Sequence, residues 1–410
     1  METVNESKSL LFEPIRINRL RLKNRLVRSA TYEGMADDSG FPTEKIFRLY
    51  GRLARGGVGL IITGFAYVAE DGVGFMPGMN GIHTDRHIAA YRKLTAHVHD
   101  NDACIAMQIA HAGRQTTEAA IGARPMAPSA VKDTSTFVRP RAMSENDIAR
   151  AIEAFGQGAR RAHESGFDAV QIHAAHGYLL SSFLCPHTNR RSDRWGGAVE
   201  NRMRIIQKIY RRCRELVGED YPILVKISAT DAMKNGLTLG ESLEMARMMD
   251  AMGFDGIEVS CGIGEDGGST IRGDLPVDVV LDHWEMYRRK NPLFKFVMRH
   301  WGQKLKPPVP FTENYNLASA RAIKQVVKTP VFAVGGFVRP TAMEAAIRNG
   351  DADGIALCRP LIADPQFPKK IANGDADVSR CIQCNLCLFY FTAAPLKCYH
   401  GKRMKLSKPA

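Results

Sequence analysis

Four of the nine cysteines crowd into one short segment near the end of the sequence, "CIQCNLCLFYFTAAPLKC" at 381–398. Three cysteines spaced as C-x2-C-x2-C are typical of a cubane iron–sulfur cluster, whereas structural zinc prefers two separated C-x2-C pairs. We therefore predict a 4Fe-4S cluster here, with a zinc site or no metal as the alternatives. The predicted ligands are Cys381, Cys384, Cys387 and Cys398.

A second group of reactive side chains stands at the end of the apolar stretch 168–174. His173, His176 and Tyr178 stand together in "QIHAAHGYLL". Two imidazoles and a phenol can hydrogen-bond a carbonyl oxygen and transfer a proton, so we predict that these three residues are catalytic. A metal site is a weaker alternative because no carboxylate or third histidine is close in sequence. A structural pair of histidines is the other alternative.

Two later segments have the composition of a phosphate site. "AVGGF" provides Gly335 and Gly336, and "ALCRPLIADP" provides Arg359. Glycines let backbone amides close on a phosphate, and arginine can bind it through two parallel hydrogen bonds. In barrel enzymes the loops after the seventh and eighth strands commonly hold a phosphate. The two segments together predict a phosphorylated cofactor.

The elements that must position these groups alternate regularly from about residue 25 to about residue 375. Apolar runs of strand length are followed by amphipathic runs of helix length, which implies a parallel sheet covered by helices. Eight such units closing on themselves make a TIM barrel. An open doubly wound sheet is the competitor, but the G-x-G-x-x-G expected after its first strand is missing. The expected strands lie at 26–30, 58–66, 104–110, 168–174, 222–228, 255–260, 329–336 and 353–358. The expected helices lie at 43–56, 84–100, 144–165, 199–217, 239–252, 316–327 and 340–349.

The predicted fold class is therefore α/β, a (β/α)8 TIM barrel with a C-terminal cysteine-rich extension. We assign residues 1–375 to the barrel and 376–410 to the cluster-binding extension. Two long connections, about 111–143 and 261–315, interrupt the regular alternation of strands and helices. Both should overhang the C-terminal face, where barrel active sites lie, as lids or substrate walls.

The net charge of +13 is concentrated in two stretches. Residues 281–306 carry seven Lys or Arg against two Asp or Glu, and residues 397–410 carry five against none. Such charge can contact a CoA phosphate, an acidic electron donor or only water. We expect 281–306 to be helical in part, and its plainest interpretation is a surface helix on the barrel rim. No nucleic-acid-binding motif accompanies the charge, so nucleic acid is not an expected partner.

The beginning of the sequence has neither the apolar region of a signal peptide nor the composition of a transit peptide. No stretch approaches the roughly 18–20 apolar residues of a membrane span. The uneven set of cysteines also favours a reducing compartment. We therefore expect a cytoplasmic protein without a membrane span.

Several motifs resemble the Old Yellow Enzyme superfamily of FMN-dependent oxidoreductases. They are "KNRLVRSAT", "VGLIITG", "MQIAHAGR", "APSAV", "IHAAHGYLLSSFLCPHTNRRSDRWGGAVENR" and "CRPLIADP". The "CxxCNxC" segment resembles the iron–sulfur branch of this superfamily, which contains 2,4-dienoyl-CoA reductase and trimethylamine dehydrogenase. The resemblance implies two cofactors, FMN and a 4Fe-4S cluster.

The resemblance also implies roles for single residues. Gln108 would read the pyrimidine edge of the flavin, and Lys226 would stabilise the anionic reduced flavin near N1 and O2. Tyr32 stands where the family usually has Cys or Thr, and Cys358 replaces the usual glycine before the phosphate arginine. The remaining residues that the resemblance places at the cofactor are Ala30, Thr31 and Gly64.

The implied activity is reduction of the C=C bond of an α,β-unsaturated carbonyl compound, with enoyl and dienoyl thioesters among the candidates. FMN N5 would deliver the hydride, Tyr178 the proton, and His173 and His176 would hold the carbonyl oxygen. The cluster would relay single electrons from a separate donor such as NAD(P)H, ferredoxin or an electron-transfer flavoprotein. Larger members of the family continue beyond the cysteines into a second nucleotide-binding region, whereas this sequence ends at Ala410. A homo-oligomer is one candidate assembly, and the sequence does not decide the oligomeric state.

Two alternatives to ene reduction remain. The first is an amine-demethylating dehydrogenase like trimethylamine dehydrogenase, which has Tyr rather than His at the first place of the "HAAH" motif. The second is an electron-transfer subunit of a larger complex. The histidine at position 173 favours ene reduction.

Overall fold

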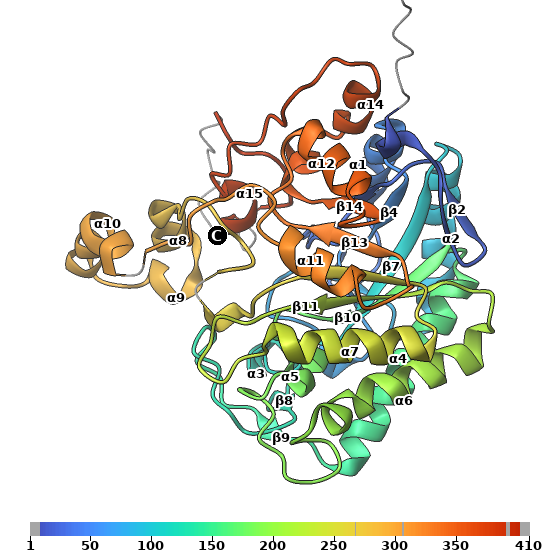
Figure 1. Cartoon of the computed structure of the whole chain (residues 1–410). Coiled ribbons are helices and arrows are strands. Elements are labelled where there is room, and N and C mark those ends of the chain that lie inside the picture. The colour runs from blue at the N-terminus through green and yellow to red at the C-terminus, as the bar shows by residue number, and fades with distance from the viewer. Residues whose placement is uncertain (1–8, 267, 306, 391–393, 402–410) are drawn as a thin grey trace, which may run out of the picture.

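Eight parallel strands close into a barrel in the computed structural model, which describes residues 9–266, 268–305, 307–390 and 394–401 (Figure 1). The strands follow the order β10-β11-β12-β13-β14-β3-β4-β7, and β7 pairs back with β10. This closure confirms the predicted (β/α)8 barrel and excludes the open sheet. The barrel strands are β3 (Leu26–Arg28), β4 (Leu60–Ile62), β7 (Cys104–Ala110), β10 (Ala169–Ala174), β11 (Ile223–Ser228), β12 (Gly256–Ser260), β13 (Val331–Val334) and β14 (Gly354–Leu357).

Seven helices that cover the outside of the barrel each lie within their predicted range. A capping box marks the start of two of them: Ser144 pairs with Asp147, and Thr238 pairs with Glu241. These helices are α1 (Glu44–Arg55), α2 (Arg86–His99), α4 (Glu145–Glu164), α6 (Val199–Val217), α7 (Leu239–Met252), α11 (Leu317–Lys324) and α12 (Pro340–Arg348).

Shorter elements complete the frame. The antiparallel pair β1 (Ile15–Ile17) and β2 (Leu20–Leu22) precedes the barrel, and β5 (Ala66–Tyr67) and β6 (Asn80–Gly81) extend its sheet. Single-turn 3-10 helices lie at Leu10–Phe12, Glu70–Gly72 and Gly264–Asp266. The other short helices are α5 (Leu179–Leu184), α13 (Arg359–Ala363), α14 (Phe367–Ala372) and α15 (Leu386–Phe389).

The barrel interior has an apolar lower layer and a polar upper layer. Alternate strand residues such as Leu60, Leu224 and Phe332 pack inside the barrel, and Ile17 and Leu22 of the hairpin join them. The hairpin therefore closes the N-terminal mouth. Farther along the same strands, the inward positions carry the buried polar residues Gln108, Gln171, Lys226 and Glu258. A polar layer below the C-terminal mouth is a place for chemistry rather than for packing.

The two long connections lie at the C-terminal side, as predicted, and differ in shape. The 111–143 connection contains α3 (Glu118–Ile121) and the paired strands β8 (Met126–Ala127) and β9 (Arg141–Ala142). The 261–315 connection contains α8 (Val277–His283), α9 (Glu285–Arg288) and α10 (Pro292–Leu305), which project from the barrel (Figure 1). We call these three helices the lobe.

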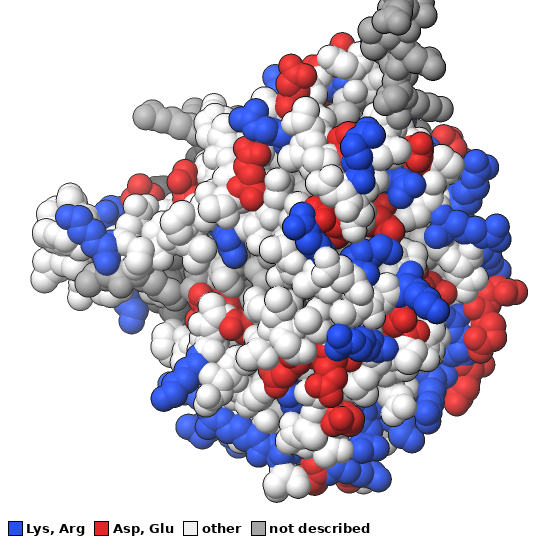
Figure 2. Space-filling model, in the orientation of Figure 1, with Lys and Arg blue, Asp and Glu red and all other residues white. Residues whose placement is uncertain are grey.

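The expectation that 281–306 is helical in part is correct, but α10 packs on α8 rather than on the barrel rim (Figure 1). Part of the basic charge is neutralised within the lobe, because Arg299 forms ion pairs with Asp278 and Asp282. On the face drawn in Figure 2, basic and acidic side chains are interspersed over the barrel. Lys306 and the basic residues of 402–410 lie outside the described residues. Within the described part of the chain, no helix has both the length and the apolar character needed to cross a membrane.

Candidate functional site

A cavity of about 440 Å³ opens at the C-terminal ends of the barrel strands. Its wall is built from loops that follow strands far apart in sequence, from the 261–315 connection and from the cysteine segment. It gathers most of the predicted site residues, namely Ala30, Thr31, Tyr32, His176, Tyr178, Lys226, Gly335, Gly336, Cys358, Arg359, Cys381 and Cys387. Ser29 and Ser260, which sequence reasoning missed, also line it. The other predicted residues, which do not line it, are Gly64, Gln108, His173, Cys384 and Cys398.

Three side chains meet at the end of β10. The His173 ring lies 5.2 Å from the His176 ring and 5.0 Å from the Tyr178 ring, centroid to centroid. His176 has φ +65° and Gly177 has φ +82°, so the chain turns sharply and brings Tyr178 back towards the strand. Phe65 contacts the Tyr178 ring edge to face at 4.9 Å and fixes its plane.

The polar atoms of this group are only partly satisfied. His176 Nε2 lies 2.7 Å from Ser260 Oγ, within hydrogen-bonding distance. His173 Nδ1 is buried without a partner, and the Tyr178 hydroxyl makes no hydrogen bond with any described residue. Unsatisfied polar atoms beside a cavity are poised to bind a polar ligand.

Burial determines the protonation of the same group. It lowers the pKa of both histidines well below the usual value, with a further contribution from the nearby Lys226. It raises the pKa of Tyr178 to about 12. At neutral pH the imidazoles are therefore neutral and the phenol keeps its proton. Neutral imidazole N–H groups can donate hydrogen bonds, and the phenol can donate a proton.

Lys226 reaches the cavity from the polar layer of the barrel. Its Nζ donates to Ser29 Oγ at 2.9 Å and forms an ion pair with Glu258 at 3.1 Å. Gln108 lies in the same layer, where its Nε2 donates to Gln171 at 2.7 Å. Ser29, Gln171 and Glu258 were not predicted. The available signal was a glutamate inside the apolar strand "DGIEVS", where alternation points it inward.

Gly64 packs against a buried carboxylate. Its amide donates to Glu33 Oε1 at 2.8 Å, and this buried carboxylate also accepts from Tyr50 and pairs with Arg28. A Cβ at position 64 would collide with the Glu33 carboxylate. The glycine is thus required by close packing on Glu33, away from the cavity wall.

The two glycines after β13 pack tightly against the end of the 261–315 connection. Gly335 has φ +126° and Gly336 has φ +80°. A Cβ on Gly335 would lie 2.6 Å from the Tyr315 ring, and one on Gly336 would lie 2.6 Å from the Thr312 carbonyl oxygen. Only glycine fits both the backbone conformation and the space.

Arg359 joins three segments in the wall of the cavity. Its Nη1 donates to the Arg272 carbonyl and to Asn385 Oδ1, both at 2.6 Å. Asn385 Nδ2 in turn donates to the Asp274 carbonyl at 2.9 Å. The barrel end, the 261–315 connection and the cysteine segment are therefore one unit at this point. Asn385, which stands between two cysteines and has φ +57°, was not predicted as a site residue.

The four clustered cysteines are free thiols around a second, smaller cavity of about 20 Å³. Cys381 and Cys387 line both cavities, whereas Cys384 and Cys398 line only the smaller one. Burial raises the pKa of the Cys381 and Cys387 thiols. As they are placed, no three His, Cys, Asp or Glu side chains of the described residues are arranged to hold a metal ion. Residues 391–393, between the third and fourth cysteines, lie outside the described residues.

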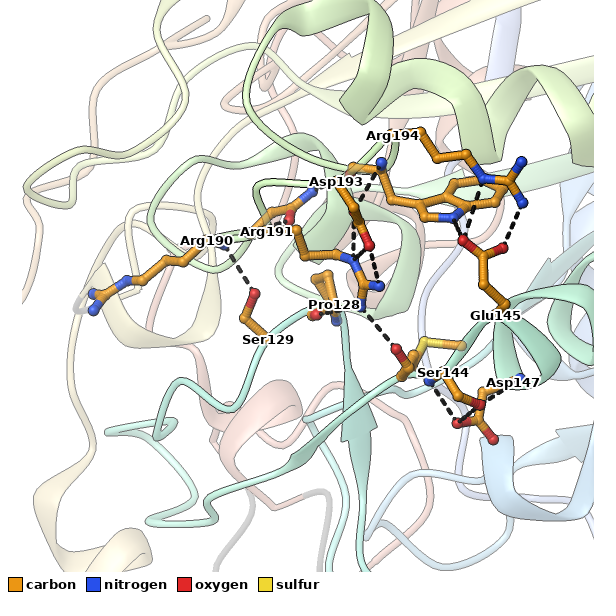
Figure 3. A network of polar contacts seen from close by, with 12 residues as sticks. Pro128, Ser129, Ser144, Glu145, Asp147, Arg190, Arg191, Asp193 and Arg194 are labelled. Carbon is orange, nitrogen blue, oxygen red and sulfur yellow. Dashed lines mark hydrogen bonds and ion pairs between the residues drawn. The ribbon is translucent and has the colours of Figure 1, made fainter.

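Much of the "HTNRRSDRWGG" motif belongs to a network of polar contacts with the 111–143 connection and the start of α4 (Figure 3). Arg191 Nη1 donates to the carbonyls of Pro128 and Met143, at 3.0 and 2.7 Å. Glu145 accepts from Arg194 at 2.6 Å and from the Trp195 indole at 2.7 Å. These contacts pin the 111–143 connection to α4 and to the loop after α5.

Comparison with known proteins agrees with this architecture. The family model "NADH:flavin oxidoreductase / NADH oxidase family" matches residues 10–305 and 297–377. A "NADH oxidase" of Thermoanaerobacter brockii is 35% identical over 383 residues, which are 92% of this chain and 53% of that protein. The chain thus spans about half the length of this curated relative.

Two solved structures share the fold. One is a 2-naphthoyl-CoA reductase in complex with 2-naphthoyl-CoA, with a TM-score of 0.81 and 27% identity over 95% of this chain and 56% of that one. The other is an old yellow enzyme homologue from Zymomonas mobilis, with a TM-score of 0.70 and 26% identity over 91% of this chain and 95% of that one. The resemblance to the Old Yellow Enzyme superfamily is confirmed. Because the family model covers nearly the whole barrel, the chain belongs to the NADH:flavin oxidoreductase / NADH oxidase family.

Proposed function

We propose that the chain binds FMN in the large cavity and reduces the C=C bond of an α,β-unsaturated carbonyl compound. The observation that carries the proposal is the group at the end of β10, where neutral imidazoles and a protonated phenol meet beside the cavity. FMN, when bound, supplies the hydride. The proton and the stabilisation of the carbonyl oxygen must come from the protein.

The lining of the cavity fits a flavin nucleotide. Lys226 offers a cation from the barrel interior, suited to negative charge on the pyrimidine part of a reduced flavin. Arg359 offers a second cation beside Gly335 and Gly336, suited to a phosphate. Between them the wall is largely apolar, as a planar tricyclic ring requires.

The roles of the catalytic group follow from its protonation. The His176 ring lines the cavity and Ser260 fixes its orientation, so we assign it to hold the substrate carbonyl. His173 assists through its contact with both other rings. The Tyr178 hydroxyl, unpaired among the described residues, is the proton donor to Cα.

The substrate class is suggested by the remaining wall. Phe75, Met76 and Ile271 provide apolar surface in the cavity wall. An extended, weakly polar enone or an unsaturated acyl thioester suits this surface. The similarity to a structure containing 2-naphthoyl-CoA supports the thioester, and the lobe offers basic side chains for CoA phosphates.

The smaller cavity is the proposed site of a 4Fe-4S cluster, which would pass single electrons between a donor and the flavin. Four thiols around one cavity form a suitable donor set, and two of them border the large cavity as well. A single zinc ion is the second candidate, because about 20 Å³ is close to the room taken by one water-sized group. Iron, acid-labile sulfide and zinc analysis of anaerobically purified protein separates the two.

Two other activities remain alternatives, oxidative amine demethylation and electron transfer without a substrate. Titration with a phenol, followed by the flavin absorbance, tests the preferred function. A phenol resembles the enolate that the histidines are proposed to hold, so it should bind, and His176→Ala should weaken binding at least tenfold. Binding unchanged in His176→Ala would reject the role of His176 and move amine demethylation ahead.

A further inference from the structure

Lys226 does not stand alone in the polar layer. Its register partner on β12 is Glu258, and the two side chains are 4% and 2% exposed. Their ion pair measures 3.1 Å. Ser29 bridges the pair, since Lys226 donates to its hydroxyl at 2.9 Å and the hydroxyl donates to Glu258 Oε1 at 2.5 Å.

The other carboxylate oxygen of Glu258 is also occupied. Gln171 Nε2 donates to Glu258 Oε2 at 2.8 Å, and Gln108 Nε2 donates to Gln171 Oε1 at 2.7 Å. A carboxylate can only accept, so Gln171 must turn its NH2 group towards Glu258 and its oxygen towards Gln108. The charge of Glu258 thereby sets the amide orientation of two glutamines in succession.

We propose that Glu258 is a positioning residue that tunes the flavin site through Lys226. It holds the lysine at the cavity floor and cancels most of its field there. The proposal rests on the proposed function, because it assumes that the reduced flavin carries its negative charge near Lys226. Glu258 itself does not line the cavity.

Simple electrostatics supports a tuning role. An isolated lysine would favour negative charge in the cavity strongly, because little solvent screens it in the barrel. Opposite charges about 3 Å apart act on a third group as a dipole, and the effect is much weaker. Buried ion pairs add little stability compared with apolar packing, so a purely structural purpose is a poor explanation for this pair.

The test is the equilibrium constant for two-electron reduction of the bound FMN, measured against a reference dye in the whole protein. Glu258→Gln should raise this constant about tenfold, which is about 30 mV for a two-electron couple. Glu258→Asp keeps the negative charge but moves it away from Lys226, so it should raise the equilibrium constant by less. A rise below threefold in Glu258→Gln, or a fall, would overturn the proposal. If only Glu258→Asp can be purified, a constant at or below that of the parent overturns it.

A matched control separates tuning from loss of packing. Glu241 is a partly buried carboxylate that pairs with Arg202 and caps α7, away from the cavity. Glu241→Gln should lower the melting temperature and leave the equilibrium constant unchanged. A parent protein that binds no FMN would defeat the proposed function instead, so the two failures are distinguishable.

Discussion

Replacement of Tyr178 by Phe isolates the proposed proton transfer unusually well. The hydroxyl makes no hydrogen bond with a described residue, so its removal leaves no described partner unsatisfied. The contacts with Phe65 at 4.9 Å and His173 at 5.0 Å are made by the ring, which Phe retains. The free energy of unfolding should therefore change by less than about 1 kcal/mol.

The catalytic loss should be much larger. General acids commonly contribute about 10²–10⁴ in rate, so loss of the phenol should slow proton transfer by about this factor. Because burial raises the pKa of Tyr178 to about 12, the parent phenol stays protonated through neutral pH. The rate of proton donation should accordingly show no titration of this group below about pH 11.

Anaerobic stopped-flow absorbance measures the two half-reactions separately. The rate of flavin reduction by dithionite should be the same in the parent and in Tyr178→Phe. The rate of reoxidation by 2-cyclohexenone should fall by about 10²–10⁴ in the variant. Thermal unfolding serves as the control for structure. Reoxidation at the parent rate would refute the assignment of Tyr178 as proton donor.

Three further predictions follow from the surroundings of the cavity. Arg359→Ala should weaken FMN binding by about 1.5–3 kcal/mol. It should also destabilise the protein without FMN, because Asn385 and the Arg272 carbonyl lose a buried donor. Fluorescence titration and thermal unfolding measure the two effects, and an unchanged flavin affinity would contradict the phosphate site. Cys384→Ser should abolish metal binding but keep FMN, since Cys384 lines only the smaller cavity; loss of FMN from a folded variant would contradict the separation of the sites. Burial lowers the pKa of His173 and His176 in the folded protein. Their contribution to the free energy of unfolding is therefore present above about pH 6.5 and is lost as the pH falls towards the lowered pKa values. The loss should be about 1.4 kcal/mol per pH unit for each histidine. Urea unfolding at several pH values measures this slope, and a slope unchanged by His173→Asn would refute the explanation.

The barrel was predictable because its signals are local. Strand-length apolar runs recur along the sequence, and the helix starts at Ser144 and Thr238 can be read within four residues. The position of His176 and Tyr178 at the cavity follows from the same pattern, since both come just after a barrel strand.

The partners of the site residues were harder to predict because they come from distant segments. Glu258 meets Lys226 only because β11 and β12 pair in that register, and Asn385 meets Arg359 only after the cysteine segment folds over the barrel end. The packing of Gly64 was equally hidden, because Glu33, which its amide contacts, lies 31 residues earlier in the sequence. Shared motifs record structural requirements as well as chemical ones.

A single-turnover experiment tests the proposed activity most directly. Protein reduced to completion under anaerobic conditions, and freed of reductant, is mixed with 2-cyclohexenone, and the flavin spectrum and the product are measured together. The proposed function predicts that the oxidised flavin spectrum returns and that one cyclohexanone forms for every two electrons consumed. Two results together would contradict the proposed function: the reduced flavin is not reoxidised by the enone, and trimethylamine reduces the flavin of the oxidised protein.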